Sequence, residues 1–545
     1  MAGTWDFDFL GSGEVLSVVW KTVVDSCDGY GPVVKVVVVR CDKKGNHVMN
    51  RRPNILLAIS DDQSWRDAGA YGHATLRTPA FDRIAGEGTL FTHGYCPAPQ
   101  CSPSRAALLA GRNIWQLEEA GTHDSLFPKR YDVYPELLRD VGYHIGYTGK
   151  PWGPGNWKDG GRLGNPAGEE YNRHKLTPPT SGISSCDYVA NLQSFLNDRS
   201  DEQPFCFWFG CREPHRPYER DSGIRAGKEV EKCDVPPFLP DVDLVRRDLL
   251  DYELEIEWFD EQLGRMVKVL EDLGELDNTL IIVTSDNGMP FPRAKANLYE
   301  FGSRVPLAMR WGQGSGQVVD GLVSLIDLAP TILEAADVAV PQEMTGRSLV
   351  GVHRGEDSGA SWNQVLTGKE RHNHARFDNV GYPCRAIRTP DFLYIQNVKP
   401  DRWPMGDPPG FFCHTKLDNP TKDYILERED ELTDLYQVTY AKRSFDELYR
   451  VEEDLGCLQN LVNDPDCADI RRELSEILNA VLREQGDPRA LAFGDIFDSY
   501  PHYAPEQESV GGFKQHGEYN PVYWQLAQEQ CAWPLTQNKV DDATS

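Results

Sequence analysis

The amino-acid sequence predicts an α/β protein in which helices cover both faces of a large β-sheet, with a smaller α+β part near the C-terminal end. Two observations support this fold class. Short unbroken apolar runs, the pattern of strands buried on both faces, recur through the first part of the chain. Segments with helical periodicity lie between them, and such alternation is typical of a sheet sandwiched by helices.

Four of these apolar runs are predicted strands, and each ends abruptly in polar or charged residues. They cover residues 55–59, 143–147, 205–209 and 280–283. Helices are predicted over residues 134–141, before the second strand, and 249–273, before the fourth. Ligands of α/β sheets bind beyond the carboxyl ends of the strands. All four runs place their most reactive side chains at that end.

The chain is predicted to have four parts. Residues 1–50 form an N-terminal extension, because Met49 stands just before the first strand and is a candidate start of translation. A catalytic domain covers residues 51–360 and ends in a stretch rich in glycine and charge. A C-terminal subdomain covers residues 361–500, with two short strands within 384–395 and an amphipathic helix over 469–484, and a tail follows over 501–545.

Composition excludes several classes of function. Acidic residues outnumber basic ones by 84 to 56, and the net charge of −28 argues against nucleic-acid binding. An anionic substrate must therefore be attracted by a local basic site. The sequence contains no run of eighteen apolar residues, so it predicts no membrane-spanning helix. The thirteen cysteines lack the spacing of a structural zinc site. No secretory signal is recognisable before the first strand, so the cytoplasm is the default compartment, and export is the alternative because the start of translation at Met1 or Met49 is open.

Residues 101–112, with the sequence CSPSRAALLAGR, are predicted to form a loop that enters a short helix. Pro103 suits a first helical turn and Gly111 suits the end of the helix. Cys101 would then lie near backbone N–H groups that favour an anion, and Arg105 would project towards the same place. The alternative is a cysteine that is merely buried.

This stretch closely resembles the motif Cys-x-Pro-x-Arg, followed by Gly-Arg, of the type I sulfatase family in the alkaline phosphatase superfamily. In that family a maturation enzyme converts the cysteine to formylglycine, an aldehyde. The resemblance covers residues 53 to about 484 and implies an alkaline phosphatase-like fold with a mixed sheet and an antiparallel C-terminal sheet. The short interval between Asp286 and Lys295 resembles the N-sulfoglucosamine sulfohydrolase branch and points to a sulfated amino sugar.

The resemblance also implies a metal site. Its ligands would be Asp61, Asp62, Cys101 after its conversion, Asp286 and Asn287. Oxygen donors of this kind suit calcium in preference to magnesium. The alternative, that both acidic pairs only cap helices or form turns, is weakened because each pair ends an apolar strand.

Other residues match the positions of the family that act on the sulfuryl group. Arg105, Lys150 and Lys295 would neutralise its developing charge, and His215 would protonate the leaving group. As the family implies, one hydroxyl of hydrated formylglycine attacks sulfur and the second drives release of sulfate.

One departure from the family pattern concerns a histidine. Many sulfatases have a histidine two residues after the lysine, where Trp152 stands here, and His123 is the candidate replacement. Glu370, His372 and His374 form a further polar cluster within possible reach of the substrate, for which a solvated loop is the favoured interpretation.

We therefore expect a hydrolase of sulfate esters or sulfamates that acts on a sulfated small molecule, sugar or glycan and depends on a formylglycine-generating enzyme. One alternative is a phosphonate monoester or phosphodiester hydrolase, because related enzymes share formylglycine and the metal site. A second is a non-catalytic binder of sulfated glycans, suggested only by the missing histidine.

Overall fold

The computed structural model describes residues 52–503, apart from 313–315, 358, 360, 374, 377–378, 409–410 and 412–418, together with four short strands before residue 49. The chain divides into two units, residues 1–52 and 53–545. In the first unit β1 (Thr4–Phe7) pairs with β2 (Leu16–Val19), and β3 (Arg40–Cys41) pairs with β4 (His47–Val48), both antiparallel. The predicted boundaries at residues 50, 360 and 500 stay predictions.

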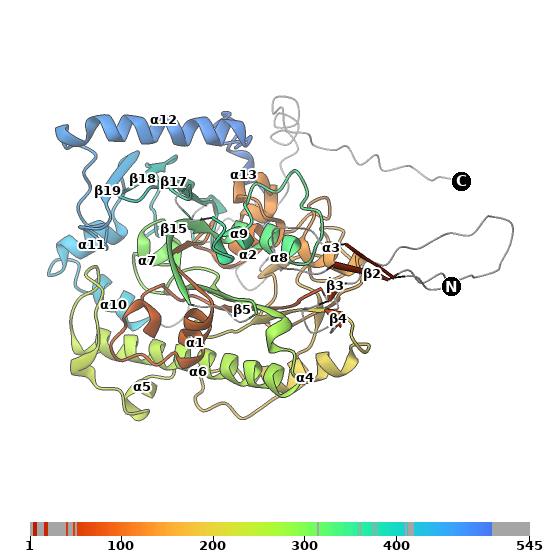
Figure 1. Cartoon of the computed structure of the whole chain (residues 1–545). Coiled ribbons are helices and arrows are strands. Elements are labelled where there is room, and N and C mark those ends of the chain that lie inside the picture. The colour runs from red at the N-terminus through yellow and green to blue at the C-terminus, as the bar shows by residue number, and fades with distance from the viewer. Residues whose placement is uncertain are drawn as a thin grey trace, which may run out of the picture. The chain divides into compact units, whose positions relative to one another are not determined.

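A mixed nine-stranded sheet forms the centre of the second unit (Figure 1). The four predicted strands are β5 (Asn54–Ser60), β8 (His144–Gly149), β11 (Phe205–Gly210) and β12 (Thr279–Ser285). They lie side by side in the order β8-β11-β5-β12, and all are parallel. The prediction of a buried parallel core is confirmed.

The remaining strands make the sheet mixed. The short strand β10 (Glu169–Glu170) pairs with β8 at one end. Beyond β12, β14 (Leu307–Arg310) runs antiparallel to both β12 and β6 (Thr89–Tyr95), while β13 (Arg304–Val305) and β15 (Gln317–Ser324) also pair with β6. The sequence pattern did not predict these strands.

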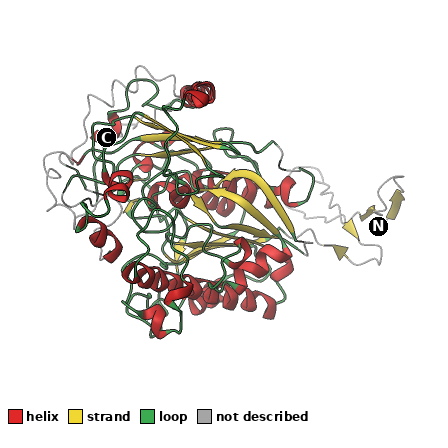
Figure 2. Cartoon of the chain, turned by 90° about the vertical axis from the view of Figure 1, so that its left-hand side faces the viewer, coloured by secondary structure: helices red, strands yellow, loops and turns green. Residues whose placement is uncertain are grey.

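Helices cover both faces of this sheet, as the side view in Figure 2 shows. Along β5, Ile55 and Leu57 face a core formed with α2 (Cys101–Ala110), α3 (Tyr134–Asp140) and α8 (Leu328–Ala335). Leu56 and Ala58 face the opposite core, formed with α1 (Pro79–Glu87), α4 (Tyr188–Asp198) and α6 (Asp243–Asp272). Both predicted helices are present, and α6 begins six residues earlier than residue 249, at Asp243.

A second, antiparallel sheet contains β16 (Val365–Lys369), β17 (Cys384–Arg388), β18 (Phe392–Asn397) and β19 (Asp446–Arg450). One of its faces packs on α12 (Ala468–Glu484) through Leu474, Leu478 and Leu482. Its other face packs on Leu298 and Tyr299. The predicted C-terminal strands and amphipathic helix are therefore confirmed, and this sheet supports the segment that follows Lys295.

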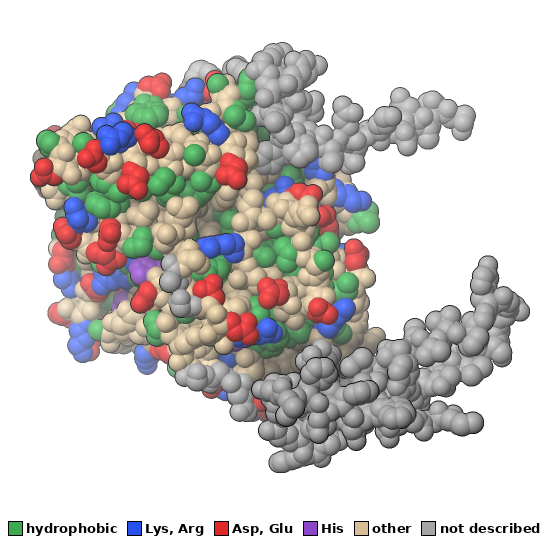
Figure 3. All heavy atoms as spheres, turned by 45° about the horizontal axis from the view of Figure 1, so that its top comes forward, with side chains coloured by type: hydrophobic (Ala, Val, Ile, Leu, Met, Phe, Trp, Pro, Cys, Tyr) green, Lys and Arg blue, Asp and Glu red, His purple; other side chains and the backbone are tan. Residues whose placement is uncertain are grey.

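Shorter elements complete the described chain. They are α5 (Ser222–Arg225), α7 (Glu300–Ser303), α9 (Val350–His353), α10 (Pro420–Leu426), α11 (Thr433–Tyr440), α13 (Ile496–Ser499), β7 (Ser125–Leu126) and β9 (Gly155–Asn156). Within the described ranges, no helix is long and apolar enough to cross a membrane. Figure 3 shows acidic and basic side chains interspersed over one face, although the whole chain has a net charge of −28.

Candidate active site

The carboxyl ends of the four parallel strands bring polar side chains together at one edge of the sheet. Asp61 and Asp62 follow β5, Asp286 follows β12, Lys150 follows β8, and His215 lies in the loop after β11. Ligand atoms of Asp61, Asp62, Asp286 and Cys101 all lie within 4.8 Å of one another. This geometry agrees with the expectation, from the sequence, that the reactive side chains gather at the carboxyl ends of these strands.

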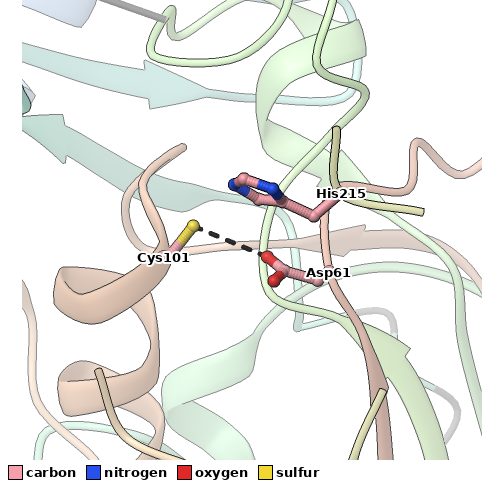
Figure 4. Close-up of side chains that lie close together, drawn as sticks. All are labelled: Asp61, Cys101 and His215. Atoms are coloured by element: carbon pink, nitrogen blue, oxygen red, sulfur yellow. Dashed lines mark hydrogen bonds between the residues drawn. The ribbon is translucent and has the colours of Figure 1, made fainter. Parts of the chain in front are cut away.

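Cys101 is the first residue of α2, which ends at Gly111 with a left-handed φ of 61°. Its Sγ lies 3.6 Å from Asp61 Oδ1 and 4.0 Å from Asp62 Oδ1. Figure 4 shows that the side chains of Cys101, Asp61 and His215 converge. Burial raises the pKa of the Cys101 thiol to about 12, so the thiol is neutral at physiological pH.

Three cations bind the three carboxylates, and of these Arg105 and Lys295 are buried and Lys150 is partly buried. Arg105 Nε donates to Asp286 Oδ2 at 2.7 Å. Lys150 Nζ donates to Asp61 Oδ2 at 2.5 Å, and Lys295 Nζ donates to Asp62 Oδ2 at 2.6 Å.

This pairing shifts the ionisation of both partners. Burial, the largest single influence, would raise the pKa of Asp61, but Lys150, His215 and Arg105 together outweigh it and lower the pKa to about 2. Burial opposes the charge on Lys295, yet the neighbouring acidic groups, Asp62 foremost, together raise its pKa above the usual range. Asp61 is therefore ionised and Lys295 is protonated at neutral pH.

The residues present fit a hard divalent cation. Asn287 Nδ2 donates to Asp62 Oδ1 at 2.7 Å, while Asn287 Oδ1 is buried and has no hydrogen-bond partner among the described residues. An unpartnered buried amide oxygen is costly unless a ligand satisfies it. Three carboxylates and an amide oxygen are the donor set that Ca²⁺ and Mg²⁺ prefer.

The site is open to solvent on the side of His215 and Lys150. Their side chains are 32% and 17% exposed, whereas those of Arg105 and Lys295 are 0% and 4% exposed. His215 Nδ1 donates to the Arg216 carbonyl oxygen at 2.7 Å, and Nε2 lies 3.8 Å from Asp62 Oδ2. Partial burial, followed by the charge of Lys295, lowers the pKa of His215. Nε2 is therefore the atom at which this imidazole gains or gives a proton.

Two tryptophans fix the backbone around the site through hydrogen bonds. Neither was predicted from the sequence to belong to it. Trp208 Nε1 donates to the Lys150 carbonyl oxygen at 3.0 Å, and Trp152 Nε1 donates to the Ser102 carbonyl oxygen at 3.2 Å. Arg105 Nη1 donates to the same Lys150 oxygen at 2.7 Å. Trp152 occupies the position of the expected histidine and thus positions the start of α2. In the sequence, only the departure from the family motif pointed to this residue.

His123 lies in a different cluster. Its Nδ1 is 2.8 Å from Asp124 Oδ2, and its ring makes an edge contact with His372 at 4.4 Å. Among the described residues, no hydrogen bond or ion pair joins His123 to Cys101 or to its three carboxylate neighbours. Its role as a replacement histidine stays a prediction.

Glu370 and His372 do not lie in the solvated loop that we favoured. Glu370 is fully buried and accepts from Arg385 Nη2 at 2.8 Å and from Arg489 Nη2 at 2.7 Å. His372 is 2% exposed. His374 lies outside the described residues. Contacts with β17 and with the segment after α12 bury what the sequence presents as a polar loop.

Comparison with known proteins identifies the family. The sulfatase family model matches residues 53–338, and the model of the N-sulphoglucosamine sulphohydrolase C-terminal region matches residues 293–408. Human N-sulphoglucosamine sulphohydrolase is 28% identical over 488 residues, which cover 81% of this chain and 92% of the relative. N-acetylglucosamine-6-O-sulfatase of Bacteroides thetaiotaomicron is 26% identical over 464 residues, covering 66% of this chain and 81% of the relative.

Solved structures share the fold. BT4656 in complex with its substrate D-glucosamine-2-N,6-O-disulfate superposes with a TM-score of 0.59 at 21% identity, over 80% of this chain and 99% of that one. Phosphonate monoester hydrolase of Agrobacterium radiobacter superposes with a TM-score of 0.58 at 18% identity, over 81% and 97%. Given the match of the family model to more than half of its length, the chain belongs to the sulfatase family of sulfuric ester hydrolases.

Proposed function

We propose that this protein hydrolyses a sulfate ester or sulfamate on a glucosamine-containing saccharide, with formylglycine made from Cys101 as nucleophile and Ca²⁺ as the bound metal. The substrate class is supported by the human N-sulphoglucosamine sulphohydrolase, and by the match to the C-terminal model of that enzyme. A formylglycine-generating enzyme is then a required partner.

The observation that carries the proposal is the placement of Cys101. Its side chain lies at the start of α2, within 4.0 Å of two carboxylates, and those carboxylates are bound by Lys150 and Lys295. A nucleophile, a cation site and positive side chains therefore meet at one point. This is the arrangement that hydrolysis of an anionic ester requires, because negative charge develops on the transferred group.

Each group has a separate task in this scheme. Asp61, Asp62, Asp286 and Asn287 would hold the cation. When present, the formylglycine hydrate supplies a hydroxyl nucleophile, and the cation polarises a sulfate oxygen. The ammonium groups of Lys150 and Lys295 and the Arg105 guanidinium orient the remaining sulfuryl oxygens and stabilise their charge.

His215 is placed to act on the leaving group. It lies on the open side of the site, with Nδ1 held by the Arg216 carbonyl oxygen. Nε2 would deliver a proton to the sugar oxygen or nitrogen as its bond to sulfur breaks.

The first experiment tests the nucleophile. The peptide that bears residue 101 should carry an aldehyde in protein from its native source, measured by intact-peptide mass. Purified protein should release sulfate from glucosamine N-sulfate or 6-O-sulfate, and Cys101→Ala should abolish the release. A wholly unmodified thiol in active protein contradicts the mechanism. Binding of sulfated saccharide without any sulfate release would instead support a non-catalytic binder.

The second experiment separates the sulfatase from the related phosphonate or phosphodiester hydrolase. Turnover of an aryl sulfate should exceed that of an aryl phosphodiester with the same leaving group. Markedly faster hydrolysis of the diester would overturn the proposal.

A further inference from the structure

Two exposed cations lie on segments that follow the carboxyl ends of strands in the central sheet. Arg212 precedes His215 in the loop after β11, and Lys175 follows β10. Both side chains are exposed, and among the described residues neither forms an ion pair with a carboxylate. The chain has a net charge of −28, so two cations without a carboxylate partner at this edge of the sheet would attract anions locally.

Backbone contacts tie both residues to the catalytic strand ends. The His215 amide donates to the Arg212 carbonyl oxygen at 3.1 Å, so one turn contains both residues. On the other side, the Gly149 amide donates to Asn172 Oδ1 at 2.7 Å, which fixes the segment leading to Lys175 next to Lys150. Both cations therefore lie on segments that follow parallel strands at the same edge of the sheet as Lys150 and His215, whose side chains are partly exposed.

The segment also turns Lys175 outward. Asn172 is held by Gly149, and the His174 ring lies 2.8 Å from Ser194 Oγ on α4. Lys175 forms a β-bridge with Cys186. Burial raises the pKa of the Cys186 thiol, and the charges of Lys175 and Arg212 oppose this rise, which places both cations near the same side chain.

We propose that Arg212 and Lys175 form a second anion subsite, which binds a further sulfate or carboxylate group of the same saccharide. The inference rests on the proposed function and narrows it: the preferred substrate is a polyanionic saccharide that carries at least one charge besides the group removed. A planar guanidinium and a mobile ammonium suit such oxyanions, since both give charge-assisted hydrogen bonds.

The test is a double variant, Arg212→Gln with Lys175→Gln. We expect its KM for glucosamine carrying both N- and 6-O-sulfate to rise about tenfold, with KM for a singly charged aryl sulfate unchanged. The dependence of KM on salt should also become weaker. Arg139→Gln is the matched control. Arg139 is exposed and has no ion pair in the described chain, but it lies on α3, before the amino end of β8 and so at the opposite edge of the sheet.

A binding measurement separates this inference from the proposed function. Titration of a sulfated disaccharide into Cys101→Ala protein measures binding without turnover. Adding the double substitution to this protein should raise the Kd about tenfold. Equal Kd values, or equal loss in the Arg139→Gln control, would overturn the subsite. If no protein releases sulfate although the double substitution weakens binding, the enzymatic function fails and the anion subsite stands.

Discussion

At the scale of single residues, the proposed mechanism assigns charge stabilisation and proton transfer to different side chains. Arg105 and Lys295 are buried and bound to carboxylates, whereas His215 is the most exposed of the catalytic candidates. A buried cation acts on any sulfuryl group, but a proton donor matters only when the departing atom is basic. The two roles can therefore be distinguished by the leaving group.

Replacement of His215 by glutamine should affect substrates unequally. Hydrolysis of a sugar sulfate, whose alkoxide is a poor leaving group, should slow by about 10²- to 10⁴-fold, the usual contribution of general acid catalysis. Hydrolysis of p-nitrophenyl sulfate should slow much less, because its phenolate departs without a proton. Steady-state kinetics on both substrates measure the difference, and an equal loss on both would argue against the assigned role.

A second residue-scale prediction concerns Glu255 on α6. This carboxyl is 1% exposed, and neither of its oxygens has a hydrogen-bond partner among the described residues. Burial raises its pKa well above the ordinary value of 4.5; Glu213 and Asp251 add to the rise and Arg216 opposes it. The folded protein thus keeps a proton that the unfolded chain releases above pH 4.5, so this group's contribution to stability falls as pH rises from there through the folded pKa.

Glu255→Gln should remove this dependence, because an amide resembles the protonated acid and does not ionise. Urea unfolding should give similar free energies for the variant and the unsubstituted protein near pH 4, and a more stable variant near pH 8. Glu261→Gln, at an exposed position on the same helix, is the control and should leave the slope unchanged. The same pH slope in all three proteins would contradict the prediction.

At the scale of elements, α2 is the part on which the site depends most. Its first residue is Cys101, and its end at Gly111 requires a left-handed backbone. A Cβ atom at position 111 would lie 3.0 Å from Met344 Sδ and 3.3 Å from Ala329 Cβ. The end of the helix is thus closely packed against α8 and the segment after it.

Gly111→Ala should therefore be more destabilising than the same change at another helix end. Gly274 follows α6 with a φ of 68°, and no heavy atom would lie within 4 Å of its Cβ. We expect a loss of about 1 kcal/mol for Gly274→Ala, from backbone strain alone, and about 2 kcal/mol for Gly111→Ala. Chemical denaturation measures both values. Equal losses would mean that the packing around Gly111 relaxes freely.

At the scale of the whole molecule, the cation site links strands that are distant in sequence. Asp61 and Asp62 follow β5, and Asp286 and Asn287 follow β12, more than 200 residues later. An ion that binds only the folded arrangement stabilises it through its binding free energy.

Calcium should therefore raise the melting temperature. A chelator should lower both the melting temperature and the rate of sulfate release. Ligand at about 100 times its Kd adds about 2.7 kcal/mol by this linkage. Asn287→Ala, which removes the unpartnered amide oxygen, should shrink the response to calcium. Calorimetric scans with Ca²⁺, Mg²⁺ and chelator provide the measurement. A melting temperature that is the same in all three would contradict a cation site.

Much of this architecture follows from local sequence. The runs that became β5, β8, β11 and β12 are apolar at nearly every position because both of their faces are buried. β6 and β15 were missed because polar residues interrupt them, and because part of β6 is only half-buried and part of β15 is exposed, so neither shows an unbroken apolar run. Likewise, Cys101, Arg105 and the acidic pairs are identifiable from their place at strand ends and a helix start.

Other features depend on contacts between distant segments. His123 meets His372, and Glu370 is buried by Arg385 and Arg489, although nothing near these residues in the sequence indicates a partner. The amino-acid sequence alone determined the buried strands, the helix start and the chemical groups at the site, because hydrophobic periodicity and chain geometry act locally. Only the tertiary structure decided which polar groups are paired and which remain exposed, because burial and charge pairing arise from residues that the fold brings together.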